Sequence, residues 1–340
     1  MEQTRERRRG YNRWIFLVLI IGSVIAARYF PPIRPHVQLP AENLTHAPLF
    51  TLPVIGDFYL TNTLLATLLA NIILLLIAWG ISRQIKKGNT ILTGIPGFFS
   101  ALVEVLYGLT ESTAGKWAKK IFPYFATITL LVLIVNWMEL IPGVDSIGFL
   151  NEEHIQHAHG CELTTIGHLF GKEIVAVGGE DECASGIVPW IRVASTDLNF
   201  TVALALMSVV MTQVIGLQTL GMGYLTKYWN AKPIARAAKK PGFGDPLGFI
   251  VALIEWAVGL LEIVAEFSKV LSFSFRLFGN IFAGSVLLFV IGTLVPVFAQ
   301  SLFLLLELFV GLIQAFVFGM LTMVFMSQAT QGHGDHADEH

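Results

Sequence analysis

Charged residues are scarce in this sequence. Of its 340 residues only 14% are Asp, Glu, Lys or Arg, while 54% are hydrophobic. Soluble chains carry about 25% charged residues. Several apolar segments here reach the roughly 20 residues that span a bilayer. The composition therefore excludes a soluble globular domain and predicts an all-α polytopic membrane protein with about five to six membrane helices. Basic residues form short runs beside apolar segments, so we expect lipid contact and no nucleic-acid partner.

The motifs of nucleotide binding and hydrolysis are missing as well. The chain contains no GxxxxGK followed by Ser or Thr, no HExxH, no GxSxG and no GxGxxG after a strand. We therefore expect neither catalysis by this chain alone nor a bound cofactor. All nine histidines lie outside the apolar segments. The polar groups inside the membrane are therefore carboxylates, amides, hydroxyls, one lysine and one arginine.

Only two cysteines are present, Cys161 and Cys183. Both lie in an acidic segment, residues 145–190, whose charge predicts a loop insert outside the membrane. There, two cysteines in one loop favour a disulfide bond. A Cys/His metal site is the alternative, because the same loop carries His154, His157, His159 and His168. The spacing matches no standard zinc pattern, so we expect no metal.

Charge and hydropathy predict four parts. They are an N-terminal membrane helix or signal peptide at 1–30, an outer loop segment at 31–60, a membrane domain at 61–328 that includes the loop insert, and a disordered cytoplasmic tail at 329–340. The basic start followed by a short apolar run fits a cleavable signal peptide. It fits a retained helix equally, and we favour the helix.

Within the membrane domain, apolar segments predict spans at 61–81, 121–141 and 200–222. The less apolar segment 94–120 suits a helix along the cytoplasmic interface. The last two segments, 247–291 and 296–328, are too long for simple spans of a bilayer core about 30 Å thick. We expect them to be strongly tilted or to lie partly in the membrane plane.

One arginine, Arg276, stands in a long apolar run. Its guanidinium stays protonated at any accessible pH, and at mid-bilayer it costs about 2.5–3.5 kcal/mol. A snorkelling arginine near a helix end is the simpler interpretation. However, Asn280 shares its helix face, and steps of seven lead back to Lys269, Glu262 and Glu255. Seven residues make nearly two turns, so these groups form a polar series that indicates a hydrated path.

The final apolar segment has two further patterns. A weaker polar series recurs in steps of seven and is interrupted at Leu321; its members are Gln300, Glu307, Gln314 and Gln328. A row of small residues comprises Gly311, Ala315 and Gly319. Such a row permits close backbone approach between helices. Ordinary packing against a neighbouring helix of the same chain accounts for it equally well.

The sequence RLFGNIFAG at 276–284 resembles the signature of subunit a of F-type ATP synthases. NWMELIPG at 136–143, ASTDLNFTVALAL at 194–206 and Gln314 within LIQAFVFGMLT are similar to other segments of that family. The resemblance covers about 61–328. It implies a non-catalytic proton-channel stator in a bacterial plasma membrane, with its last two helices packed against a c-ring. The implied partners are the c-subunit ring, the b subunits of the peripheral stalk and the rest of the F1Fo complex.

The resemblance also implies roles for individual residues. Arg276 would separate two half-channels and meet the carboxylate of the ring. Glu262 and Lys269 would line the cytoplasmic half-channel. The outer half-channel would be lined by Asn136, Glu139, Asn280, Glu307 and Gln314. Ser285 departs from the family, which often has an acidic residue or histidine there. Lys269 is alternatively a snorkelling residue, and we expect Glu255 and Glu266 to be merely solvated.

Two other classes of function remain open at the level of sequence. A stand-alone secondary transporter would use the intramembrane charges as a substrate site, but the two halves show no convincing repeat. A structural scaffold would not explain why a charged residue, Arg276, stands in a long apolar run. Protons are the expected coupling ion, because the chain shows no cluster of oxygen ligands for sodium.

Overall fold

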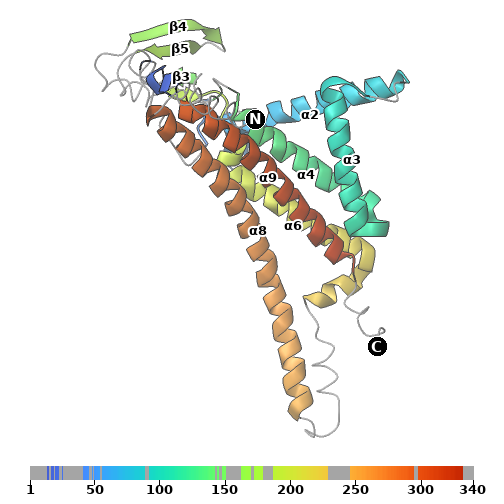
Figure 1. Cartoon of the computed structure of the whole chain (residues 1–340). Helices are drawn as coiled ribbons and strands as arrows, with labels where there is room; N and C mark the ends of the chain where they lie inside the picture. Colours follow the sequence, from blue (N-terminus) through green and yellow to red (C-terminus); the bar gives the residue numbers. More distant parts are fainter. Residues whose placement is uncertain are drawn as a thin grey trace. The chain divides into compact units, whose positions relative to one another are not determined.

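The computed structural model (Figure 1) describes residues 14, 17, 18, 20–22 and 25, and then 41–331 apart from 46–47, 49, 54–55, 89–91, 142–143, 145–147, 151–161, 170–171, 179–186, 229–245 and 295–297. Its helices are α2 (Asn62–Lys86), α3 (Gly94–Ala114), η1 (Gly115–Trp117), α4 (Ala118–Met138), η3 (Ala194–Thr196), α6 (Leu198–Leu220), η4 (Gly221–Lys227), α8 (Pro246–Leu294) and α9 (Phe298–Ala329). Its strands are β1 (Phe50–Leu52), β2 (Gly56–Phe58), β3 (Gly148–Leu150), β4 (Glu162–Leu169), β5 (Lys172–Gly178) and β6 (Ile187–Pro189).

Five helical segments of the described chain are long and apolar enough to cross a membrane. They are Asn62–Lys86, Gly94–Met138, Leu198–Leu225, Trp256–Gly292 and Ala299–Ala329. The all-α polytopic fold is therefore confirmed. Figure 1 shows α8 as one unbroken helix, and its 49 residues together with the 32 of α9 match the two long segments predicted from hydropathy.

Small antiparallel sheets, which the hydropathy did not predict, occur in the two polar segments. Strands β1 and β2 form a hairpin within the expected outer loop. The loop insert holds a sheet of order β4-β5-β3-β6, in which β4 and β5 pair along most of their length (Figure 1). Period-two alternation over short stretches is easily missed beside the stronger signal of the spans. Cys161 and Cys183, the two residues of the predicted disulfide, lie outside the described residues.

The chain divides into two compact units, of which the first comprises Met1–Ile72, Val132–Asp197 and Phe278–Gln314. Buried polar contacts join its distant segments. Thr63 Oγ1 donates a hydrogen bond to Asp197 Oδ2 over 3.0 Å, and both side chains are buried. The amide of Asn62 donates to the Pro189 carbonyl. The start of α2 is thereby tied to the segment that leads into α6.

The second unit comprises Ile73–Leu131, Leu198–Leu277 and Ala315–His340. Its apolar core is built from α3, α4, α6 and the end of α9. The largest buried members are Leu106, Ile121, Phe125, Ile215, Met323 and Met326. Leu106, for example, is 1% exposed although it lies on a helix of only moderate hydropathy. Burial against other helices of the same chain therefore holds α3 in place.

The small residues of α9 pack against α4. In the first unit Gly311 lies against Asn136 and Trp137, and in the second Gly319 lies against Thr129. A side chain at either glycine would meet these atoms, so the absence of a Cβ permits the close approach. The alternative of ordinary packing within the chain is the correct interpretation of this row.

We expect Gly319→Leu to destabilise the chain. The Thr129 hydroxyl already occupies the space that a Cβ at position 319 would need, and overpacking a tight helix contact costs about 1–3 kcal/mol. Thermal unfolding of the full chain in detergent, followed by circular dichroism, would show a lower Tm. Gly108→Leu is the matched control, because a Cβ there meets nothing within 4 Å. An equal loss in both variants would contradict the explanation.

Candidate functional site

Arg276 lies on an exposed face of α8. Its Nη2 is 3.5 Å from the Ser272 hydroxyl one turn earlier, which is a long and weak hydrogen bond. It forms no ion pair with any residue that the structure describes. The neighbouring Leu271 and Phe275 are 54% and 55% exposed. The guanidinium therefore stands uncompensated beside apolar side chains on the surface of this chain.

Asn136 is buried near the end of α4, where both ends of its amide are engaged. Ser195 Oγ donates a hydrogen bond to Asn136 Oδ1 over 2.6 Å, and Asn136 Nδ2 donates to the Gly311 carbonyl over 3.1 Å. The adjacent Trp137 Nε1 donates to the Leu308 carbonyl. These contacts fasten α4 to α9 and to η3. The side chain of Asn136 thus holds three segments of the first unit together.

Glu139 is buried one turn beyond Asn136. Its carboxylate accepts a hydrogen bond from the hydroxyl of Ser285 on α8. The same hydroxyl lies 3.1 Å from the Ile281 carbonyl, so its single proton has two alternative acceptors. Ser285 stands where the family often has a titratable side chain. In this chain the residue at that position is a serine, and the carboxylate beside it comes from Glu139, in the turn that follows α4.

Glu307 is buried on α9 with its carboxylate against Gly284 of α8. A Cβ at position 284 would overlap both carboxylate oxygens, so the carboxylate would have to shift if any other residue stood there. Glu307 is 6% exposed, and its Oε1 has no hydrogen-bond partner among the described residues. A buried carboxylate oxygen in that state calls for a proton or a water molecule.

Two further amides predicted for the site make no side-chain hydrogen bond within the described chain. Asn280 is exposed on α8, and Gln314 is half-buried on α9. Their polar atoms are therefore open to water or to another subunit. Together with Asn136, Glu139 and Glu307 they lie in the first unit, so the structure brings all five residues of the predicted outer route into one compact part of the chain.

The second unit holds Glu262, Lys269 and Arg276. Lys269 Nζ is 2.8 Å from Glu266 Oε1, and the same ammonium group lies 4.6 Å from the centroid of the Phe325 ring. These contacts hold the lysine in a defined position. The expectation that Glu266 is merely solvated is wrong, because this carboxylate is largely buried and paired. Hydropathy alone did not distinguish Glu266 from a solvated residue. The signal available in the sequence was its spacing, because Lys269 lies one helical turn away on the same face.

A tyrosine pair that the sequence did not point to, a buried Tyr224 and a half-buried Tyr228, joins this cluster to α6. The hydroxyls of Tyr224 and Tyr228 lie 2.9 and 2.6 Å from Gln213 Oε1, and that of Tyr228 is also 3.3 Å from Glu266. Burial raises the pKa of the Tyr228 phenol above its ordinary value, and Tyr224 and Glu266 raise it further. The phenol therefore stays neutral and able to donate. A glutamine inside an apolar span, Gln213, was the available signal.

The sequence also matches a known protein family. A family model described as ATP synthase A chain matches residues 64–327, which is most of the sequence. The match includes α4, α6, α8 and nearly all of α9, and so every side chain described above. The chain therefore belongs to the ATP synthase A chain family.

Proposed function

We propose that this subunit of the F-type ATP synthase is the proton-channel stator, in which Arg276 separates two half-channels that serve the c-ring. The proposal rests on the surroundings of the Arg276 side chain. It is exposed on an apolar helix face and has no ion pair within the described chain. In a membrane such a cation needs a counter-charge from another chain. The carboxylate on each ring subunit supplies one.

Arg276 acts in this proposal as an electrostatic partner and a barrier. A ring carboxylate that faces lipid is expensive when charged, so it is deprotonated only while it lies opposite a fixed cation. Arginine suits this role because it does not lose its proton, whereas a buried lysine can. The same charge repels a proton that would otherwise cross directly from one half-channel to the other.

The outer route is proposed to run through the first unit. Glu139 and Glu307 are its two titratable groups, and both are buried carboxylates. A carboxylate of this kind can accept a proton from the outside and release it toward the ring. Ser285, Asn280 and Gln314 offer hydroxyl and amide groups that order water between them. Asn136 contributes mainly by fastening α4 to α9.

The cytoplasmic route is proposed to use Glu262 and Lys269 on α8. The hydrogen bond from Lys269 to Glu266 and the ring of Phe325 hold the ammonium group in place. We therefore add Glu266 to this route as a positioning residue. The Tyr228 hydroxyl lies 3.3 Å from Glu266 Oε1 and 2.6 Å from Gln213 Oε1, so it connects this carboxylate to α6.

Disulfide cross-linking tests which face of the chain meets the ring. In an assembled complex with Cys161 and Cys183 replaced by serine, we expect Ser272→Cys to cross-link to a cysteine placed beside the ring carboxylate. Ser272 is exposed and contacts Arg276, so it shares the face that meets the ring. Ser112→Cys, another exposed serine of the same unit, is the matched control. Cross-linking at the control position but not at Ser272 would contradict the proposal.

A further inference from the structure

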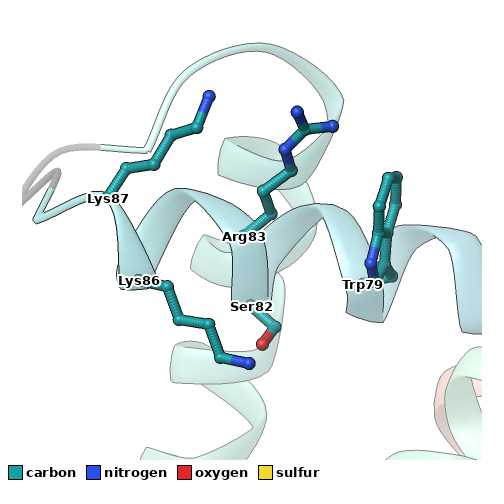
Figure 2. Close-up of a pocket in the computed structure, with 5 residues that line it drawn as sticks. All are labelled: Trp79, Ser82, Arg83, Lys86 and Lys87. Atoms are coloured by element: carbon teal, nitrogen blue, oxygen red, sulfur yellow. The ribbon is translucent and has the colours of Figure 1, made fainter.

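A cluster of basic and aromatic side chains lies at the end of α2, which contains none of the residues of the proposed proton route. A hollow of about 300 Å³ there is lined by Trp79, Ser82, Arg83, Lys86 and Lys87. Their spacing of i, i+3, i+4, i+7 and i+8 places all five on one face of the helix. Figure 2 shows Trp79, Arg83 and Lys87 extending to one side of the helix end, with Ser82 and Lys86 next to one another on the adjoining side.

The three cations of this cluster have no carboxylate partner. Among the described residues none of Arg83, Lys86 and Lys87 forms an ion pair. The Arg83 guanidinium lies 5.3 Å from the Trp79 ring centroid, within the range of a cation–π contact. Three positive charges therefore line the hollow, and no carboxylate of the described residues neutralises them.

The backbone next to the cluster is held in place. The amide of Gln84 makes two hydrogen bonds with Thr93, from Nε2 to the carbonyl and from the Thr93 N–H to Oε1. Gly88 ends the helix with a φ of 78°, a conformation that other residues rarely adopt. These contacts connect the end of α2 to the start of α3. The last turn of α2 is therefore held against the residue that precedes α3.

An apolar stripe, which includes Leu75 and Leu76, lies next to the cluster on the same face of the helix. Leu75 and Leu76 lie four and three residues before Trp79 and are 69% and 59% exposed. Only 11% of the apolar window of α2 is buried within the chain. An exposed apolar stripe directly below unpaired cations and a tryptophan matches the two halves of a phospholipid. An acidic protein segment would match the cations but would leave the stripe uncovered.

We propose that the basic end of α2 binds the headgroup phosphate of an anionic phospholipid, whose acyl chains lie along the stripe. Arg83, Lys86 and Lys87 would surround the phosphate, and the Ser82 hydroxyl would donate a hydrogen bond to it. Ordinary flanking cations beside a span would attract anionic lipid without holding it at one place. The contact between Arg83 and Trp79 and the hollow lined by all five residues distinguish this site from such a flank.

Native mass spectrometry of the full chain with added phosphatidylglycerol or phosphatidylcholine tests the site. We expect the variant in which Arg83, Lys86 and Lys87 are all replaced by glutamine to bind phosphatidylglycerol at least about tenfold more weakly than wild type. The matched control replaces Lys116, Lys119 and Lys120 by glutamine. It removes the same charge from a second cluster around Trp117, where Lys116 and Lys120 also approach the ring. This control should bind as wild type does.

Several outcomes would overturn the proposal. The first is an equal fall of phosphatidylglycerol binding in both variants, which would indicate an effect of bulk charge alone. The second is unchanged binding in both variants. The third is that wild type binds phosphatidylcholine as well as it binds phosphatidylglycerol. Displacement of the lipid by glycerol phosphate at equal concentration would assign the site to a free phosphate instead. If the triple variant does not fold, Trp79→Leu keeps every charge. It should weaken phosphatidylglycerol binding about threefold while Trp117→Leu does not, and the opposite result would also refute the site.

Discussion

Substitution of Arg276 by alanine is expected to abolish ATP-driven acidification of inverted membrane vesicles while the ATP synthase complex still assembles. The fixed cation is the proposed partner of the ring carboxylate, whose charged form costs about 2.5–3.5 kcal/mol at the bilayer centre. Without it, the population of the deprotonated carboxylate between the half-channels falls by roughly a hundredfold. Rotation of the ring is then blocked at this step.

Three comparisons sharpen this experiment. Arg276→Lys keeps a positive charge but can lose its proton when buried, so we expect it to pump poorly as well. Lys119→Ala removes an exposed cation and should pump as wild type does. The alanine variant should also dissipate an imposed proton gradient faster, because the barrier between the half-channels is gone. Pumping at near wild-type rate by Arg276→Ala would refute the central proposal and return attention to a transporter mechanism.

Replacement of Glu307 by glutamine is expected to lower proton pumping by roughly a hundredfold. The amide keeps the shape of the side chain and its place against Gly284 but cannot carry the proton. Glu307→Asp keeps the carboxylate and should retain a substantial part of the activity. Glu104→Gln is the matched control, because it neutralises an exposed carboxylate on α3. Initial rates of vesicle acidification at equal complex content measure all three variants.

A second variant tests the same carboxylate without altering it. Gly284→Leu should reproduce the loss, because a side chain at position 284 overlaps the space of the Glu307 carboxylate. Gly284→Ala should have a smaller effect, since a flexible carboxylate can move away from one methyl group. If Gly284→Leu pumps normally while Glu307→Gln does not, the observed packing is irrelevant to the route. If both pump normally, Glu307 has no role in it.

The sequence alone determined the membrane fold and its main elements. Hydrophobic length and flanking charge are local properties, so the spans and the long helices α8 and α9 followed directly from composition. The signature around Arg276 was equally local, and the family match confirmed the resemblance drawn from it. The short strands were missed because their alternating pattern is weak beside apolar runs of twenty residues.

Only the tertiary structure decided which polar groups meet. Glu139 and Ser285 are 146 positions apart in the chain, and Asn136 and Gly311 are separated by 175. No periodicity along one helix can pair residues that far apart, because helix packing sets which faces come together. The absence of a Cβ at Gly284 matters because the folded chain places the Glu307 carboxylate against this residue. Likewise, Glu266 meets the hydroxyl of Tyr228, which lies 38 positions earlier in the chain.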